Sequence, residues 1–162
     1  HMDVKGWKVA RPADIPLGKV AIVQGAVGIC CGQVGRQNVP HGVVLAGGNV
    51  GLIQLLGNTH CLYFEGDPVI DVGANAILGA LVTETPSQPG ALLAGPGGAC
   101  VLGCWKDFHQ ATWHGIALDG SMTPGDELFD CKRAVITKWD LSVRAPDGRL
   151  ETLAHVEALG AT

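Results

Sequence analysis

Short apolar segments alternate along the whole chain with turns rich in glycine, proline and asparagine. Most of these segments contain several β-branched residues, a composition typical of β-strands. We therefore predict strands in the following residue ranges: 19–29, 41–45, 50–56, 60–64, 76–83, 99–105, 111–118 and 134–143. Roughly ten short strands separated by turns are typical of an all-β protein, a single-domain sandwich or a barrel-like sheet.

The last apolar segment, residues 150–158, fits two different elements. Leu150, Leu153 and Val156 lie on one stripe of a helix. The segment fits a strand about as well, because hydrophobic periodicity distinguishes the two poorly over so few residues. The pattern leaves both elements open.

A short motif occurs twice, as Gly66–Asp71 (GDPVID) and as Gly125–Asp130 (GDELFD), each followed by an aliphatic segment. A Gly-Asp pair before apolar residues is typical of a turn that leads into a strand, so we predict two similar hairpin units. The four aspartates of the motifs are possible calcium ligands, but Asx-type turns, in which the carboxylate accepts backbone N–H groups, explain them more simply. These aspartates are Asp67, Asp71, Asp126 and Asp130.

The beginning of the chain differs from the rest. Residues 1–18 are polar, contain prolines and show no clear period, so we predict an extended N-terminal arm there. His1-Met2 is interpreted as a cloning remnant. Residues 19–162 then form the β-domain, for which two similar halves joined near residues 85–98 are one possible organisation.

Composition narrows the classes of function. Glycine supplies 24 of the 162 residues while only 16% are charged and 47% are apolar, which argues against disorder. The net charge is −4 and the longest basic run is Lys132-Arg133, so we expect no direct contact with nucleic acid. The sequence shows no signal peptide and no apolar stretch of the ~18 residues that a membrane span requires, so we expect no membrane contact.

A low density of charge also favours self-association. Between Leu17 and Val50 the only charged side chains are Lys19 and Arg36. A surface of this kind would be poorly solvated if it were fully exposed. We therefore expect a homo-oligomer.

The most suggestive chemical pattern is Cys100-x3-Cys104-x4-His109-x4-His114. Two thiols and two imidazoles are the ligands that tetrahedral zinc prefers. On one straight strand, however, Cys100 and Cys104 would lie about 13 Å apart, so a shared metal would require a tight turn at Gly103. The simpler interpretation is a strand with free thiols followed by loop histidines, and we expect no cofactor.

Nucleophilic catalysis has little support in the sequence. The chain lacks a G-x-S-x-G motif, and its few serines have no distinctive context. A thiol–imidazole pair, Cys61 with His41 or Cys104 with His109, stays possible because such pairs form in space rather than in sequence. Without an export signal, the six cysteines are expected to be free and mostly buried thiols. We predict no catalytic residue.

Two segments carry a resemblance to a known family. The segment Gly115–Asp130 (GIALDGSMTPGDELFD) resembles a pattern found in small β-rich decoration, or cement, proteins on the capsids of tailed bacteriophages. In that pattern a strand and turn precede a Gly-Asp-x-Leu step, and a closing strand similar to Leu153–Leu159 follows. The segment Ile15–Val23, with its glycine-spaced continuation, is similar to the opening strands of such proteins.

The resemblance implies a non-enzymatic structural protein that binds and stabilises a viral capsid surface as an oligomer, often a trimer. It implies the major capsid protein as partner, and a location on the virion capsid surface after assembly in the host cytoplasm. Residues 3–18 would be the segment that contacts the shell. The alternative is a small β-domain with a Cys/His zinc site or a thiol-based enzymatic activity.

Overall fold

The computed structural model describes residues 5–32, 39–72, 77–82, 88–95, 98–108, 110–128 and 133–158, with backbone alone for 77–82. Within these residues the protein consists of antiparallel strands in two sheets and two short 3-10 turns, as the sequence predicted for an all-β sandwich. The first sheet, sheet A, contains β1 (Trp7–Ala10), β2 (Val20–Val23), β3 (Ala26–Cys31), β4 (His41–Ala46), β5 (Ile53–Leu55) and β6 (Cys61–Phe64).

The second sheet, sheet B, is built from the later part of the chain. Its strands are β7 (Pro68–Asp71), β8 (Ile77–Val82), β9 (Leu92–Gly95), β10 (Gly98–Lys106), β11 (Ala111–Ala117), β12 (Met122–Pro124), β13 (Arg133–Arg144) and β14 (Leu150–Glu157). The 3-10 turns are η1 (Pro12–Asp14) and η2 (Gly125–Glu127).

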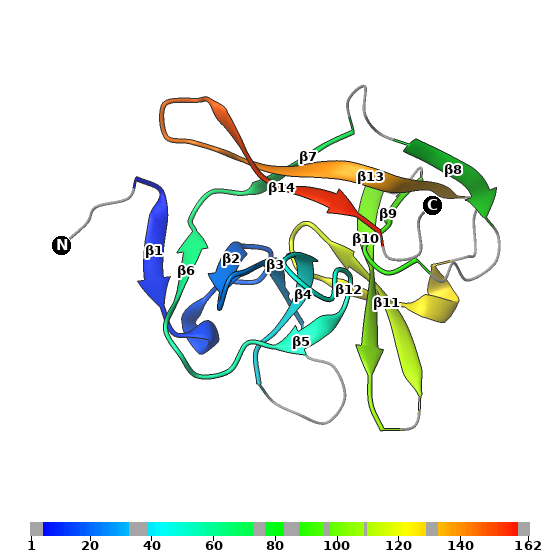
Figure 1. Ribbon diagram of the computed structural model, residues 1–162, viewed down its shortest axis with the longest axis horizontal. Coiled ribbons are helices and arrows are strands. Elements are labelled where there is room, and N and C mark those ends of the chain that lie inside the picture. The colour runs from blue at the N-terminus through cyan, green and yellow to red at the C-terminus, as the bar shows by residue number, and fades with distance from the viewer. Residues whose placement is uncertain are drawn as a thin grey trace.

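The strand orders show how consecutive parts of the chain make the two layers (Figure 1). Sheet A has the order β1-β6-β2-β3-β4-β5, and sheet B has the order β12-β11-β10-β9-β13-β14. The long strand β13 also pairs with β7 and with β8. The chain therefore passes from one sheet to the other between Phe64 and Pro68.

This crossing point corrects the predicted division near residues 85–98. Residues 88–90 lead into β9, and Gly95 pairs with Gly98 between β9 and β10, so the described part of 85–98 lies within sheet B. The main core fills the space between the two sheets and includes Val43, Ile116 and Leu141, all fully buried. Because both sheets share this core, they form one packed unit.

The described part of the predicted arm belongs to the sandwich. Trp7–Ala10 form β1, which pairs with β6 along its whole length. Pro12 in η1 and Ile15 are buried, and the Trp7 ring packs edge-on against Phe64 with centroids 5.2 Å apart. The extended arm was therefore wrong for residues 5–18, because apolar residues spaced among the polar ones anchor this segment to sheet A.

The single strand predicted for residues 19–29 is a hairpin of β2 and β3. Gln24 and Gly25 form its turn, with φ of 50° and 81°. Positive φ at both central residues is what the tight right-twisted hairpin turn requires, and Asn-Gly or Asp-Gly is the common signal for it. A glutamine at the first position hid the turn from the sequence pattern.

The two Gly-Asp motifs do not form equivalent units. Gly66-Asp67 leads into β7, as predicted, but Asp67 forms an ion pair with Lys19 Nζ at 3.0 Å, which joins the crossing segment to the start of β2. Gly125-Asp126 instead begin the 3-10 turn η2, and Asp130 lies outside the described residues. Asx-type turns occur elsewhere, for example at Asp119, whose carboxylate accepts the Ser121 N–H at 2.9 Å.

The ambiguous segment 150–158 forms a strand, because pairing with β13 places alternate residues in the core. Trp139 pairs with Val156, and Leu141 pairs with Ala154. Val156 and Ala154 are buried, while His155 between them is exposed. The indole N–H of Trp139 donates to the Gly90 carbonyl at 3.0 Å and so ties β13 to the segment before β9.

Candidate functional site

The most distinctive surface feature is a hollow over the outer face of sheet A, which we call the sheet A groove. Alternate residues of a strand point to opposite faces, and those facing sheet B build the core. On the outer face of β2, β3 and β4 the corresponding positions include Ala21, Gly28 and Gly42. Because these side chains are small or absent, the face is hollowed, and the groove has a volume of ≈ 320 Å³.

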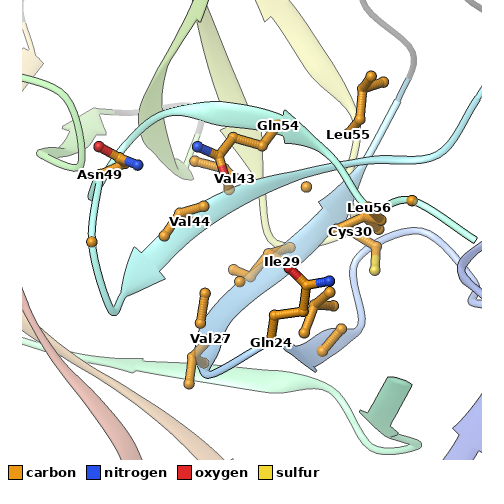
Figure 2. A pocket seen from close by; sticks show the side chains of 17 residues that line it. Gln24, Val27, Ile29, Cys30, Val43, Val44, Asn49, Gln54, Leu55 and Leu56 are labelled. Atoms are coloured by element: carbon orange, nitrogen blue, oxygen red, sulfur yellow. The ribbon is translucent and has the colours of Figure 1, made fainter. Parts of the chain in front are cut away.

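Aliphatic side chains line the groove and three amides lie along it (Figure 2). Leu56 and Cys30 lie together at one end, and Asn49 lies toward the other. Gln54 of β5 and Gln24 of the β2–β3 turn contribute amide groups from opposite sides. The groove thus offers hydrogen-bonding groups beside aliphatic side chains.

Two of these amide residues have an unusual backbone. Gln24 has φ of 50° and Asn49 has φ of 63°, and they are the described non-glycine residues with positive φ. Asparagine tolerates this conformation, whereas glutamine gains nothing from it locally. Within the described residues, no side-chain hydrogen bond is formed by Gln24, Asn49 or Gln54, so their donors and acceptors face solvent or a ligand.

The groove is electrically neutral. Its described lining contains no Asp, Glu, Lys, Arg or His. Its one ionisable group is the Cys30 thiol, and burial, helped by the neighbouring Cys61 and Cys31, raises the pKa of Cys30 to about 12. The groove therefore carries no charge over the physiological pH range.

The candidate zinc ligands do not converge in the structure. Cys104 pairs with Trp113 and Gly103 pairs with His114, and β10 continues straight through Gly103 to Lys106. Directly opposed residues point to the same face, so His114 faces sheet A, whereas Cys100 and Cys104 point to the other side of sheet B. The turn at Gly103 that a shared metal needs is absent, and His109 lies outside the described residues.

The candidate thiol–imidazole pair of Cys61 and His41 is also separated. The Cys61 thiol lies on the outer face of sheet A, 3.6 Å from the Ala10 carbonyl. The His41 ring lies on the inner face, against Trp105 at a centroid distance of 5.0 Å. Their sheet therefore stands between them, and the pair Cys104–His109 falls on an undescribed residue.

The thiols share an environment that suppresses reactivity. The described cysteines are free, as predicted, and Cys131 lies outside the described residues. Burial raises the pKa of each of them: Cys30, Cys31, Cys61, Cys100 and Cys104. Since the thiolate is the nucleophile, this environment does not favour thiol chemistry.

Two histidines that the sequence suggested only as a thiol partner and as a zinc ligand, His41 and His114, have buried ring nitrogens. Nε2 of His41 and Nε2 of His114 are buried and have no hydrogen-bond partner among the described residues. Nδ1 of His41 lies 2.7 Å from the Val39 carbonyl, which makes it the protonated nitrogen of a neutral ring. Burial lowers the pKa of both imidazoles. No sequence signal separates such residues from surface histidines.

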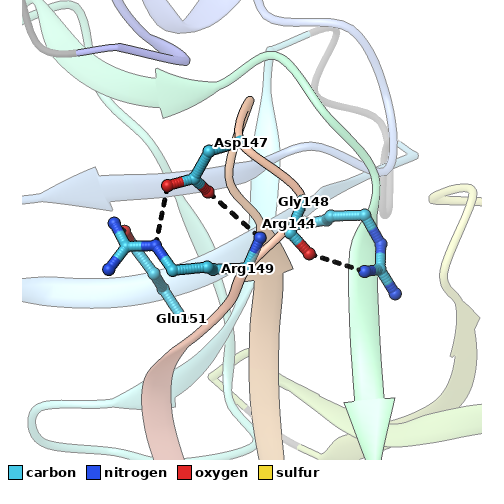
Figure 3. Close-up of polar contacts among 5 residues, drawn as sticks. All are labelled: Arg144, Asp147, Gly148, Arg149 and Glu151. Carbon is cyan, nitrogen blue, oxygen red and sulfur yellow. Dashed lines mark hydrogen bonds and ion pairs between the residues drawn. The ribbon is translucent and has the colours of Figure 1, made fainter.

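A second surface feature is the tip of the β13–β14 hairpin (Figure 3). Arg149 Nε contacts the Asp147 carboxylate at 2.7 Å, and Arg144 Nη1 donates to the Gly148 carbonyl at 2.8 Å. Glu151 lies 3.9 Å from Arg149. The charges at this tip are thus largely balanced within the hairpin itself, which makes it a weaker candidate for a binding site than the groove.

Comparisons with protein-family models, with curated proteins and with solved structures find no match for this chain. Its function therefore has to be argued from its own geometry. The described residues contain no group of three or more His, Cys, Asp or Glu side chains placed to hold a metal ion. They also include no helix with the length and apolar character needed to cross a membrane.

Proposed function

We propose that this chain is a non-enzymatic structural protein that binds and stabilises a viral capsid surface as a homo-oligomer, with a trimer as the expected state. Its partner would be the major capsid protein, and its place the outer surface of the virion. One observation carries the proposal. Sheet A displays apolar surface, with Val9 67% exposed on β1 and Leu62 37% exposed beside it on β6.

The apolar exposure is concentrated on one layer of the sandwich. Eight large apolar side chains are exposed among the described residues, and five of them precede the crossing to sheet B. Those five are Val9, Leu17, Val39, Leu55 and Leu62. Val9 and Leu62 lie on the same face of sheet A as Trp7 and Phe64, whereas the neutral groove lies on the opposite face. Sheet A thus carries exposed apolar residues on its β1–β6 pair and a neutral groove on its outer face, features of a layer that is covered in an assembly.

The resemblance gains support from a contact between its two segments. Gly120, in the turn after β11, packs so closely on Gly18 that a Cβ at Gly120 would lie 2.5 Å from the Gly18 nitrogen. The Gly32 N–H also donates to the Gly120 carbonyl at 3.1 Å. Segments 15–23 and 115–130, distant in sequence, therefore belong to one structural unit. Leu128, the leucine of the Gly-Asp-x-Leu step, is 1% exposed in the cluster that covers sheet B.

Light scattering and capsid binding test this proposal. Purified protein should elute as an oligomer, with three times the chain mass of 16.8 kDa as the expected value. It should also co-sediment to saturation with expanded empty heads of the virus that encodes it, and raise their melting temperature. Protein that stays monomeric and remains in the supernatant at every concentration would refute the proposal.

A matched pair of substitutions localises the contact. Val9→Lys places a charge on the exposed row of sheet A, and Leu150→Lys does so at the start of β14 in sheet B. Both residues are exposed, so neither substitution should unfold the protein. Val9→Lys is expected to weaken self-association or head binding, while Leu150→Lys leaves both unchanged.

A further inference from the structure

We propose that the sheet A groove is a docking site for an extended, uncharged peptide segment with aliphatic side chains. Given the proposed function, on which this inference rests, the segment would belong to the shell subunit. The shape of the groove, its amide groups and its lack of charge each restrict what can bind there. Together they favour an extended, uncharged peptide segment.

The shape of the groove fits a peptide in extended conformation. Its floor follows the strands across Gly28 and Gly42, and its ends are marked by Asn49 and by Leu56 (Figure 2). A volume of ≈ 320 Å³ is enough for a few aliphatic side chains. Displacing water from the aliphatic part of the lining provides the hydrophobic gain on binding.

The hydrogen-bonding groups fit a peptide backbone. An extended segment presents N–H and C=O groups alternately, and a primary amide can donate to one and accept from the other. Gln24 and Gln54 approach the groove from opposite sides and Asn49 approaches it from one end, so the three amides can hold a segment along its length. The described lining lacks aromatic rings and carboxylates, the groups on which sugars usually depend for stacking and hydrogen bonding.

The neutrality of the groove selects against charged segments. A Lys, Arg, Asp or Glu side chain docked against Val23, Val44 and Leu56 would lose hydration without gaining an opposite charge. An uncharged segment avoids this cost. The uncharged groove therefore favours a peptide segment that carries no charge.

The turn residue Gln24 links this inference to the fold. Glycine fits a φ of 50° better than glutamine does, so Gln24→Gly should keep or raise the stability of the β2–β3 hairpin. The unfavourable backbone conformation of Gln24 is explained if its side-chain amide binds the docked peptide. Gln24→Gly is therefore expected to bind peptide on the order of tenfold more weakly without any loss in melting temperature.

A charge substitution provides the second variant. Gln54 is exposed on β5 and lines the groove, so Gln54→Lys introduces an ammonium group there without disturbing the core. Gln110→Lys is the matched control, because Gln110 is exposed in the β10–β11 turn of sheet B. Gln54→Lys should reduce peptide binding by at least about tenfold, and Gln110→Lys should leave it unchanged.

The probe is a library of random twelve-residue peptides displayed on filamentous phage and selected on the wild-type protein alone, after which each enriched peptide is measured against the Gln24→Gly, Gln54→Lys and Gln110→Lys variants. The expected result is enrichment of uncharged peptides with aliphatic residues at alternate positions, which lose binding to Gln24→Gly and to Gln54→Lys. Enrichment of charged peptides, enrichment of none, or equal binding to all variants would overturn the inference.

Failure of this inference and failure of the proposed function give different results. If the protein binds expanded heads but the groove variants bind them as tightly as wild type, the docking site is wrong and the capsid function stands. If neutral aliphatic peptides bind the groove but heads are not bound, the docking site stands and its natural source is another protein.

Discussion

Replacing Gly51 by alanine should destabilise the sandwich more than replacing any glycine of an open turn. Gly51 has φ of 83°, and a Cβ added there would lie 2.2 Å from the Gly90 nitrogen. The same residue accepts the Cys104 N–H at 2.8 Å, so it connects sheet A to sheet B. The substitution therefore acts where the two sheets meet.

The magnitude follows from two separate costs. A left-handed conformation costs an alanine ~1–2 kcal/mol. The Cβ also meets backbone, which cannot rotate away, so the sheets must separate locally at ~1–3 kcal/mol, the usual cost of overpacking. The sum of ~2–5 kcal/mol is a large fraction of the stability of a typical domain. For a chain of this size it corresponds to a decrease in melting temperature of ~4–20 °C.

Two control glycines separate these costs. Gly25 has φ of 81° but nothing within 4 Å of an added Cβ, so Gly25→Ala should lose only the conformational ~1–2 kcal/mol. Gly48 has open space and no positive φ, so Gly48→Ala should raise the free energy of unfolding slightly, by less than about 1 kcal/mol. Urea unfolding followed by tryptophan fluorescence measures all three. Equal losses for Gly51→Ala and Gly25→Ala would refute the role of the contact with Gly90.

Two further predictions concern buried titratable groups. Because burial lowers the pKa of His41 and His114 below the ordinary 6.5, the folded state binds fewer protons than the unfolded chain in acid. Their stabilisation should be complete above pH 6.5 and decrease as the pH falls below it, which thermal melting between pH 7.5 and 5 would measure. A His41→Gln/His114→Gln variant should show a flatter profile, and an unchanged slope would contradict the assignment. Because the pKa of Cys30 and of Cys31 is about 12, iodoacetamide at pH 8 should alkylate them on the order of a thousandfold more slowly in the native protein than in urea. Peptide mass mapping checks this, and comparable rates would show that these thiols are accessible.

The fold class was predictable because it depends on features that sequence displays directly. Segment 41–45 became β4 and segment 134–143 became most of β13, since both combine β-branched residues with flanking turns. The last strand was not predictable, because the apolar residues of segment 150–158 fit the period of a helix and that of a strand equally well. Pairing of Val156 with Trp139 makes this segment a strand, and local sequence does not show which residues of another strand will pair with it.

The candidate site could not be predicted, because it depends on which residues share a face. The groove combines positions from four strands, and Gln24 was read as part of a strand rather than as a turn residue. The same limitation affects the Cys/His pattern. Sequence spacing brought Cys104 and His114 close, but the register of β10 and β11 places them on opposite faces of sheet B. A test for turns at Gln-Gly would have revealed the hairpin.

The distribution of charge explains why sheet A, rather than the hairpin tip, is the surface to expect at an interface. Of the 26 charged side chains in the chain, seven precede Glu65 and nineteen follow from it onward. The chain crosses from sheet A to sheet B at this residue, so the two layers differ in charge as well as in strand order. Burying sheet A against a partner removes few charges from water, whereas burying sheet B would desolvate ion pairs such as Lys138–Glu157 at a net cost. Because each sheet is built from one consecutive part of the chain, the composition of that part alone sets how much charge its layer carries.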